Sequence, residues 1–355
     1  MKVAIDISPL KSGHKVRGVG FYLENLKKSL VEYENSIEYV FFDEEKEIPN
    51  NIDLVHYPYF DPFFLTLPIF KKYKTIVTVH DLTPLVFPKA FPKGLKGNIK
   101  WQMQKIALRT TCAVITDSKA SKSDIVKFTG INEEEIHVVY LAAGEEFMKM
   151  EDARLPDGQG RWKMEIRKKY NLPEKFVLYV GDVTWNKNLP RLVEALKKTN
   201  LPLVMVGKAI ASNDFDKNNF WNSDLTKVQN LIKGDERFLR LGFVPTIDLV
   251  CLYNLATVFV MPSLYEGFGL PVLEAMSCGC PVVTTKEGSL KEIAGDAAFF
   301  VEAYDTESIA DGINKVFSDK LIQENLSREG LVWAKNFKWK KTAKNTAAVY
   351  KSLTS

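Results

Sequence analysis

The sequence predicts an α/β protein of two Rossmann-like domains that face a central cleft. Three observations lead to this prediction. The chain has 355 residues, which is long for a single hydrophobic core. Short apolar runs typical of buried parallel strands alternate, in two blocks, with segments of helical apolar spacing. Each block also carries a glycine-rich loop directly after a predicted strand, where open α/β sheets bind nucleotides.

The composition excludes several classes of protein. Hydrophobic residues make up 46% of the chain and charged residues 26%, as in ordinary globular domains. A net charge of +4 is too small to indicate strong nucleic-acid binding. The four cysteines show no disulfide framework, and Cys278 and Cys280 lack a second pair of zinc ligands. Met1 leads straight into a predicted strand and no apolar run is long enough to span a membrane, so we expect a cytoplasmic protein without a signal peptide.

The amino-terminal block begins with a strand and a loop that contains Gly18 and Gly20. Its predicted strands are residues 2–7, 39–43, 54–57, 75–80, 114–117 and 136–140. Gly18 and Gly20 give a ligand close access to the backbone, or they form a plain tight turn; a strict GxGxxG pattern is absent. His80 ends a strand, at the edge where a parallel sheet faces its cleft, so we expect it to donate a hydrogen bond to a ligand hydroxyl. Asp81 either orients His80 or caps the next turn.

Two segments of this block leave alternatives open. The aromatic run at residues 57–68 is either core or an exposed surface that docks a sugar or a lipid. Residues 89–109 form a helical segment with basic side chains at Lys93, Lys96, Lys100, Lys105 and Arg109. This segment is either a solvated basic face or a contact with an anionic membrane surface.

The predicted connection between the domains is the segment 151–161, which is rich in proline, glycine and charge. The first domain is therefore expected to cover residues 1–160 and the second to cover residues 161–336. Predicted strands of the second block are residues 176–180, 203–207, 240–244, 258–261 and 281–285.

The stretch from Met261 to Val283 predicts an anion-binding site. It combines a strand end, a glycine loop and a helix that opens with a proline in its first turn. Amides at the start of a helix have no helical partner, and the positive end of the helix dipole favours an anion such as a diphosphate. The predicted anion-binding residues are Gly267, Phe268, Gly269 and Leu270.

Two carboxylates, Glu266 and Glu274, flank this anion site. Each would repel a phosphate, so we expect them to accept hydrogen bonds from hydroxyl-rich groups on either side of a diphosphate. The alternative is that Glu266 caps the helix and that Glu274 is simply solvated.

A second glycine loop, at residues 181–188, follows the strand at 176–180. Gly181 permits close approach of the backbone, and Lys187 near the next helix can neutralise a diphosphate as a point charge. A solvated lysine is the alternative for Lys187. Lys208, after the following strand, is a candidate for a partner charge.

The sequence from Glu266 to Glu274 resembles the Glu-x7-Glu signature of retaining glycosyltransferases of family 4. The segments RGVGFY (17–22) and HDLTPLVFP (80–88) also resemble segments of that family, most closely those of mannosyltransferases, and the resemblance covers most of the chain. It implies the GT-B fold, in which the first domain is the acceptor side and the second domain binds the nucleotide sugar. A terminal helix, here about 337–355, packs back on the first domain.

The resemblance also implies a role for each site residue. Glu266 would lie at the donor sugar, Glu274 would bind the ribose, and Lys187 would stabilise the departing diphosphate. The remaining donor contacts would come from Gly18, Gly20, His80, Phe243 and Val244, the last two through the main chain to the base. Asn186 stands where many members have arginine, which removes half of the expected positive charge.

The sequence therefore predicts a retaining, metal-independent glycosyltransferase without a cofactor. No DxD-type metal motif stands at a strand end, and the family is usually metal-independent. The expected donor is GDP-mannose or a UDP-hexose, with mannose favoured, and the expected acceptor is a glycan or a lipid-linked glycan in polysaccharide or glycoconjugate synthesis. One alternative is a catalytically degenerate nucleotide-sugar-binding or regulatory protein, which only Asn186 supports. A nucleotide-sugar epimerase of the same fold would need a different carboxylate and histidine set.

Overall fold

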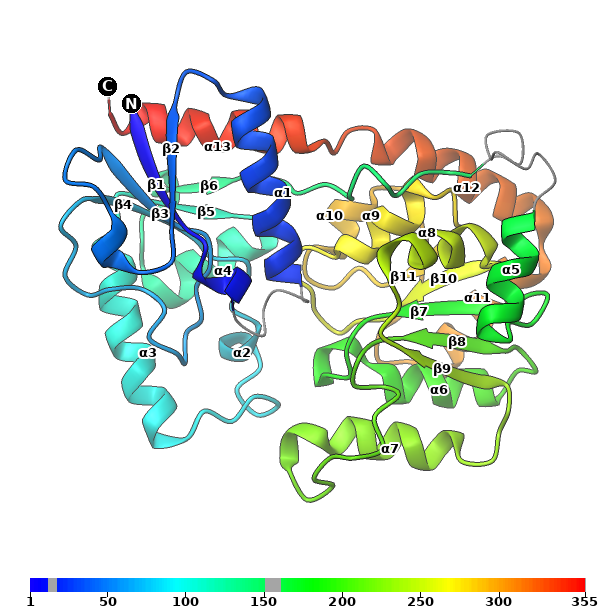
Figure 1. The fold of residues 1–355 in the computed structure, drawn as a ribbon. Coiled ribbons are helices and arrows are strands. Elements are labelled where there is room, and N and C mark those ends of the chain that lie inside the picture. Colours follow the sequence, from blue (N-terminus) through cyan, green and yellow to red (C-terminus); the bar gives the residue numbers. More distant parts are fainter. Residues whose placement is uncertain (12–17, 151–160, 355) are drawn as a thin grey trace. The chain divides into compact units, whose positions relative to one another are not determined.

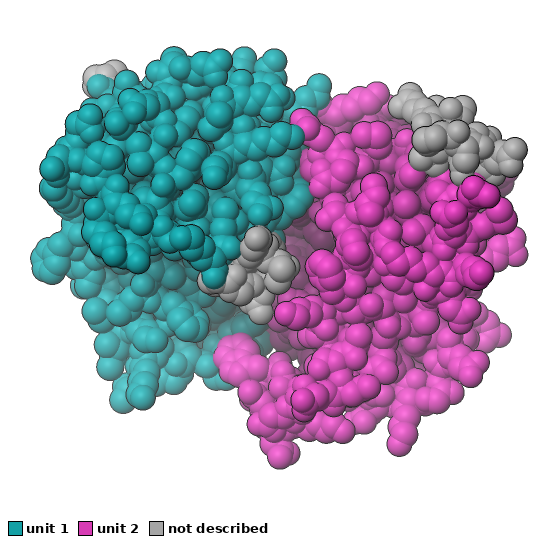
Figure 2. Space-filling view, viewed as in Figure 1, with its two compact units in different colours: residues 1–142, 337–355 teal, residues 143–336 magenta. Residues whose placement is uncertain are grey.

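The computed structural model describes residues 1–11, 18–150 and 161–354. It consists of two compact units, with residues 1–142 and 337–355 in unit 1 and residues 143–336 in unit 2 (Figure 2). The sequence places the division near residue 160, whereas the structure groups residues 143–150 with unit 2. Hydrogen bonds explain this grouping, because the Asn254 side chain accepts from the N–H of Met150 at 2.7 Å and donates to the carbonyl of Met148 at 3.0 Å. The rest of the predicted connection, residues 151–160, lies outside the described residues.

Unit 1 contains a parallel sheet, six-stranded over the described residues, in the order β2-β1-β3-β4-β5-β6 (Figure 1). The strands are β1 (Lys2–Asp6), β2 (Glu38–Phe42), β3 (Leu54–Tyr57), β4 (Lys74–Thr78), β5 (Ala113–Thr116) and β6 (Ile136–Val138). The α-helices are α1 (Gly18–Tyr33), α2 (Thr83–Val86), α3 (Gly94–Arg109), α4 (Lys119–Thr129) and α13 (Trp339–Ser352). Short 3-10 helices are η1 (Ser8–Lys11), η3 (Glu45–Glu47) and η4 (Glu133–Glu135). All residues of β3 and β5 are buried, as expected for central strands with both faces covered.

Two expectations about the first half of unit 1 change in the structure. Gly18 and Gly20 lie in the first turn of α1 and not in a loop before it. The aromatic run 57–68 is neither wholly core nor wholly surface, because Tyr57 and Phe60 are buried whereas Phe64 is exposed.

The last helix, α13, belongs to unit 1 and packs against α1. The hydroxyl of Thr342 donates to the carbonyl of Tyr140 at 2.7 Å, and the hydroxyl of Tyr350 reaches His56 in β3. The C-terminal helix α13 is thus part of the same compact unit as the N-terminal elements β1 and α1.

Unit 2 contains a second parallel sheet, also six-stranded over the described residues, in the order β12-β11-β10-β7-β8-β9 (Figure 1). The strands are β7 (Val177–Val180), β8 (Leu203–Val206), β9 (Phe238–Gly242), β10 (Val258–Met261), β11 (Val282–Thr284) and β12 (Phe299–Phe300). The α-helices are α5 (Arg161–Tyr170), α6 (Leu189–Lys197), α7 (Ser223–Ile232), α8 (Thr246–Leu255), α9 (Leu270–Ser277), α10 (Leu290–Ala294), α11 (Thr306–Ser318) and α12 (Lys320–Ala334). The 3-10 helices are η6 (Trp185–Lys187) and η7 (Phe220–Asn222). The sequence does not predict β12, because a strand of two residues shows no periodicity.

The apolar spacing of the helices determines which face is buried. In α6, the side chains of Leu189, Leu192, Val193 and Leu196 are all buried against the sheet of unit 2. Among the residues that the structure describes, no helix is both long and apolar enough to cross a membrane.

Candidate active site

The candidate site of unit 2 lies at the carboxyl edge of its sheet. β7 and β10 are neighbouring parallel strands, so the loops that follow them, residues 181–188 and 262–269, leave the sheet at the same edge (Figure 1). The loops contact each other directly, because the N–H of Leu264 donates to the carbonyl of Asn186 at 2.7 Å. Open α/β sheets bind their ligands at this edge.

An ion pair joins the two predicted catalytic residues of this unit. The ammonium nitrogen of Lys187 lies 2.8 Å from Oε1 and 2.9 Å from Oε2 of Glu266. Glu266 is only 7% exposed, and a carboxylate buried to this extent needs a charged or hydrogen-bonding partner. The helix-capping alternative for Glu266 is wrong, because α9 has no side-chain cap and its N-cap residue is Gly269. Lys187 and Glu266 therefore place opposite charges at one point of the sheet edge.

Ser289 holds the backbone that carries Glu266. Its hydroxyl oxygen lies 3.0 Å from the carbonyl oxygen of Glu266 and 2.8 Å from that of Phe268. Its N–H also donates to the carbonyl of Glu266 at 3.1 Å. Gly288 has a φ of +58°, and a Cβ there would lie 2.5 Å from the carbonyl oxygen of Glu266, so a side chain does not fit. Sequence reasoning missed both residues, although a glycine and a serine after the predicted strand at 281–285 were a usable signal.

Asn186 connects the two loops. Its side-chain amide donates to the carbonyl of Tyr265 at 3.0 Å, and its side-chain oxygen accepts from the hydroxyl of Thr184 at 2.8 Å. Together with the 2.7 Å backbone bond to Leu264, these contacts hold the residue before Lys187 against the residue before Glu266. The asparagine that replaces the expected arginine thus has a structural role that the sequence does not reveal.

Asn188 forms a second link from the loop after β7. It has a left-handed backbone with φ of +59°, and its buried amide donates to the carbonyls of Pro262 at 2.9 Å and Ala303 at 2.7 Å. Arg191 donates in turn to the side-chain oxygen of Asn188. This residue was also missed, although asparagine is one of the few residues that adopt a left-handed conformation readily.

The predicted anion-binding residues lie where β10 leads into α9. Gly267, Phe268 and Gly269 are buried and Leu270, the first residue of α9, is partly exposed. Gly269 has a φ of +95° and packs against Leu290, so this turn requires glycine. On the neighbouring loop, a Cβ on Gly181 would lie 3.1 Å from the hydroxyl oxygen of Tyr179.

Glu274 lies in the second turn of α9 and is buried rather than solvated. Its Oε2 accepts a hydrogen bond from the hydroxyl of Tyr253 at 2.9 Å. Burial raises the pKa of Glu274 to about 7; the Tyr253 hydrogen bond opposes this shift, and the charge of Glu146 adds to it. Glu274 is therefore a carboxyl group that titrates near neutral pH.

The other predicted donor residues of unit 2 also lie at the carboxyl edge. Lys208 follows β8 and is exposed, whereas Phe243 and Val244 follow β9. Val244 is buried and the side chain of Phe243 is exposed. Within the described residues, the contacts that join Lys187 and Glu266 do not include these three.

In unit 1, His80 lies just beyond the end of β4 and forms an ion pair with Asp117. The Nδ1 atom of His80 lies 2.6 Å from Oδ2 of Asp117, which follows β5, the neighbouring strand. Asp81 does not orient His80; its carboxylate caps the next turn by accepting from the N–H of Thr83 at 2.8 Å. The adjacency of β4 and β5 was the signal that could have identified Asp117, which is a strand-end carboxylate.

The environment of His80 determines its protonation. Burial lowers the pKa of the imidazole, but the charge and hydrogen bond of Asp117 outweigh burial and raise this pKa above its usual value. The ring of Tyr22 packs edge-on against His80, with centroids 4.7 Å apart. The Nε2 atom is buried and has no hydrogen-bond partner among the described residues. His80 thus has a buried Nε2 atom just beyond the carboxyl end of β4.

His56 is a second buried histidine with the opposite character. It lies in β3, with Nδ1 2.7 Å from the hydroxyl of Tyr350 and Nε2 2.8 Å from the hydroxyl of Thr78. Burial, aided by the charge of His80, lowers the pKa of His56 to about 3. A neutral His56 therefore stabilises the packing of α13 and does not take part in the candidate site.

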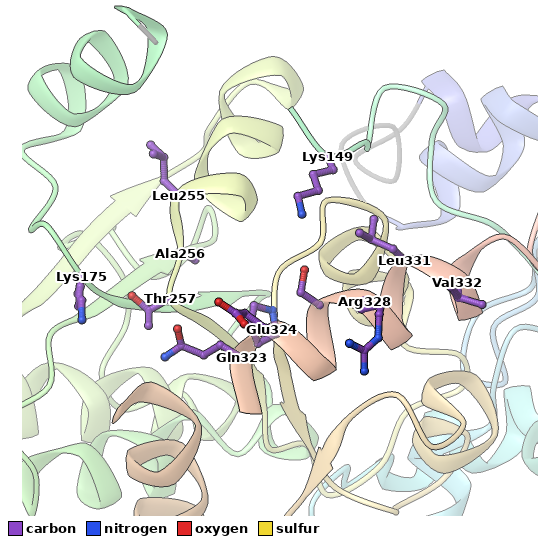
Figure 3. Close-up of a pocket in the computed structure, with 12 residues that line it drawn as sticks. Lys149, Lys175, Leu255, Ala256, Thr257, Gln323, Glu324, Arg328, Leu331 and Val332 are labelled. Atoms are coloured by element: carbon purple, nitrogen blue, oxygen red, sulfur yellow. The ribbon is translucent and has the colours of Figure 1, made fainter. Parts of the chain in front are cut away.

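Among the described residues, no group of three or more His, Cys, Asp and Glu side chains could hold a metal ion. A cavity of about 650 Å³ in unit 2 lies elsewhere (Figure 3). It is bordered by residues 255–257 before β10, by Pro281 before β11 and by side chains of α12 such as Arg328. This cavity therefore lies at the amino edge of the sheet, opposite the ion pair of Lys187 and Glu266.

Comparison with known proteins identifies the family. The family model described as Glycosyltransferase Family 4 matches residues 16–143, and the model described as Glycosyl transferases group 1 matches residues 162–333. The chain is 30% identical over 290 residues to O-antigen chain mannosyltransferase B of Escherichia coli, covering 79% of this chain and 71% of that protein. The chain belongs to glycosyltransferase family 4.

The chain also resembles a further relative in sequence and several solved structures in fold. The serotype-specific mannosyltransferase WbdA of Escherichia coli is 27% identical over 278 residues, which are 76% of this chain and 32% of WbdA, so the chain spans about a third of that relative. Sucrose-phosphate synthase from Thermosynechococcus elongatus superimposes with a TM-score of 0.76 at 17% identity, over 99% of this chain and 98% of that one. Anabaena HepE in complex with UDP-glucose gives a TM-score of 0.73 at 17% identity, over 99% and 100%. The GT-B fold predicted from the sequence is confirmed.

Proposed function

We propose that this glycosyltransferase is a retaining, metal-independent hexosyltransferase that transfers mannose from GDP-mannose, in preference to glucose from UDP-glucose, to a glycan or lipid-linked acceptor. The product would belong to polysaccharide or glycoconjugate synthesis. The mannosyltransferase names of its Escherichia coli relatives support the choice of sugar.

The ion pair between Lys187 and Glu266 carries this proposal. In a nucleotide sugar, the anomeric carbon is bonded directly to the diphosphate. The groups that bind the sugar and the diphosphate must therefore lie within a few ångströms of each other. A cation 2.8 Å from a carboxylate oxygen, beside the helix start at Leu270, offers this pair of contacts.

Each residue of the site has a separate role in the proposed reaction. Lys187 and the amides at Gly267–Leu270 stabilise the negative charge that develops on the departing diphosphate, without a divalent ion. Glu266 accepts hydrogen bonds from donor-sugar hydroxyls and positions the sugar, while Glu274 accepts from the ribose hydroxyls. The departing phosphate oxygen takes the proton of the acceptor hydroxyl as the new glycosidic bond forms on the same face, which retains the anomeric configuration.

His80 contributes from unit 1. Asp117 orients its ring, so the buried Nε2 is the atom that we assign to the donor-sugar hydroxyls. Gly18 and Gly20, in the first turn of α1, offer backbone amides to the diphosphate. Lys208, Phe243 and Val244 are assigned to the remainder of the nucleotide.

A peripheral membrane contact through α3 is part of the proposal. Leu95, Ile99 and Ile106 are exposed on this helix, at spacings of four and seven residues that put them on one face. Lys93 and Lys100 lie over the rings of Phe63 and Phe64 beside it. An apolar stripe bordered by lysines fits an anionic membrane surface.

The membrane contact is tested by sedimentation with vesicles of phosphatidylglycerol and phosphatidylcholine. We expect binding that falls in high salt and in Ile99→Glu, with Ile247→Glu as a control for an exposed isoleucine of unit 2. If the two variants bind the vesicles equally, α3 is a solvated basic face and not a membrane contact.

The transferase activity is tested with GDP-mannose, UDP-glucose and UDP-GlcNAc in the presence of EDTA, with donor hydrolysis and transfer to mannosides as readouts. We expect turnover of GDP-mannose without added metal and an α-linked product by NMR. Turnover that requires a divalent ion, or an inverted product, would contradict the proposal. Binding of a donor without any turnover would favour the degenerate protein.

A further inference from the structure

The loop between β8 and α7 presents two large aromatic side chains to solvent. Phe220 is 54% exposed and its neighbour Trp221 is 51% exposed, and their rings meet edge-on with centroids 6.1 Å apart. They form η7, directly before α7 (Figure 1). A folded protein normally buries rings of this size, so an adjacent exposed pair marks a binding surface.

Packing and hydrogen bonds within the loop hold Phe220 and Trp221 in place. Phe215 packs against the core of unit 2 and anchors the middle of the loop. At its start, the carbonyl of Ser212 accepts from the side chain of Gln229 in α7 at 2.7 Å. Near its end, the side chain of Asn222 donates to the carbonyl of Asp216 at 2.9 Å, and the Asn219 side chain accepts from the N–H of Trp221 at 3.0 Å. The aromatic pair is thus supported from both sides by hydrogen bonds.

The polar residues around the pair narrow the choice of ligand. The exposed polar residues of this loop are mostly carboxylates and amides, at Asn213, Asp214, Asp216, Asn218 and Asn219, with one basic side chain, Lys217. Aromatic faces attract the polarised C–H groups of a sugar ring, while amides and carboxylates bond to its hydroxyls. A lipid surface would favour an uninterrupted apolar patch with basic neighbours, and here acidic side chains are interspersed.

We propose that Phe220 and Trp221 form a subsite for a neutral oligosaccharide, the acceptor glycan of the transferase. The loop follows β8, the neighbour of β7, so it leaves the sheet at the same carboxyl edge as Lys187 and Glu266. A growing glycan bound there would therefore lie at the edge of the sheet that carries the candidate active site of the same unit. The identification of the glycan as an acceptor rests on the proposed function; the binding of an oligosaccharide does not.

The test is a titration of the protein with mannotetraose, maltotetraose and chitotetraose, followed by tryptophan fluorescence and calorimetry. We expect at least one tetrasaccharide to bind, and we expect Trp221→Ala and Phe220→Ala each to weaken that binding at least tenfold. Phe70→Ala removes a 93% exposed aromatic ring of unit 1 and is the matched control, with no effect expected. Both loop side chains are half exposed, so the variants fold, which a thermal melt verifies.

Three results would overturn the subsite. They are no binding of any tetrasaccharide, equal binding in the double variant Phe220→Ala/Trp221→Ala, or a blue shift of tryptophan fluorescence that only lipid vesicles cause and that Trp221→Ala lacks. The melting temperatures of the unmodified protein and of the same variants with GDP and UDP separate this proposal from the proposed function.

If tetrasaccharides bind but neither nucleotide raises the melting temperature, the result counts against the donor site alone. An intact nucleotide shift without tetrasaccharide binding would count against the subsite alone.

Discussion

Each unit has a basic side chain beside a buried carboxyl group at the carboxyl edge of its parallel sheet, but the two pairs differ in kind. In unit 2, Lys187 contacts both oxygens of Glu266, at 2.8 and 2.9 Å. In unit 1, His80 contacts one oxygen of Asp117 at 2.6 Å and keeps Nε2 buried and unpartnered within the described residues. The ammonium group of a lysine is a compact point charge, whereas the imidazole of a histidine offers a directed hydrogen bond.

The difference assigns a separate role to each pair: electrostatic stabilisation to Lys187 and Glu266, and positioning through a hydrogen bond to His80 and Asp117. A fixed positive charge suits a developing phosphate anion, which needs compensation at every pH. An imidazole held by a carboxylate suits a sugar hydroxyl, which needs a directed hydrogen bond. The comparison predicts that variants of the unit 2 pair have larger effects, and that variants of the unit 1 pair change the pH dependence.

The largest effect is expected from Glu266→Gln. The change preserves shape but removes the charge that orients the donor sugar and balances Lys187. We expect kcat to fall about 100- to 1000-fold, as for other groups that act in the transition state. Steady-state transfer measures this loss, and Glu307→Gln, at an exposed residue that pairs with Lys198, is the control. A wild-type rate in Glu266→Gln would remove this residue from the mechanism.

Asp117→Asn is expected to have the next largest effect. Without the carboxylate, burial dominates, the pKa of His80 falls, and activity drops by about tenfold to 100-fold at neutral pH. An NMR titration of the imidazole measures the pKa directly.

The raised pKa of His80 also makes stability depend on pH. Its contribution to the stability of the folded protein is complete at low pH and is lost as pH rises through the pKa of His80 in the folded protein. The melting temperature of Asp117→Asn should therefore lack this fall with rising pH. An unchanged titration of His80 would contradict the pairing.

Glu274 should make donor binding depend on pH. Ribose hydroxyls donate to the carboxylate, so the affinity is expected to rise as pH increases and to level off above the pKa of about 7. The slope below that pKa is about tenfold per pH unit. Because the pKa of Glu274 in the folded protein lies above its ordinary value of 4.5, the protonated carboxyl group stabilises the folded state. This contribution to stability falls as pH rises from 4.5 to about 7.

Two variants sharpen this prediction. Tyr253→Phe removes the hydrogen bond that lowers the pKa of Glu274, so the binding midpoint should move to higher pH. Glu274→Gln should remove the pH dependence and lower the affinity. Calorimetry between pH 5.5 and 8.5 measures both, and a pH-independent affinity of the unmodified protein would disprove the assignment.

The smallest effect on transfer is expected at Asn186. Asn186→Ala removes the hydrogen bonds with Tyr265 and Thr184 and should cost about 1–3 kcal/mol of unfolding free energy. Denaturant unfolding measures it, with the exposed Asn218→Ala as control. Asn186→Arg should not increase activity, because it loses the same link between the loops; a clear gain would favour a degenerate site.

The sequence predicts the fold class well because alternating strands and helices leave a strong periodic signal, but it did not identify the helices α7 and α12 or the two-residue strand β12. It also predicts several strand-end site residues, including Lys187, Glu266 and His80. It does not predict their partners, because Asp117 and Ser289 meet their targets through strand order, which periodicity does not encode. The role of Asn186 was likewise hidden, since its contacts cross from one loop to another.

The central claim is that the pair of Lys187 and Glu266 forms part of a nucleotide-sugar site, and a thermal-shift screen tests it most directly. The unmodified protein, Lys187→Met and Lys187→Arg are melted with GDP, UDP, GDP-mannose, UDP-glucose and UDP-GlcNAc in EDTA. The account predicts that one nucleotide family raises the melting temperature by mass action, that Lys187→Met abolishes the shift and that Lys187→Arg retains part of it. A shift of the same size in Lys187→Met, or no shift with any of the five ligands, would contradict the account.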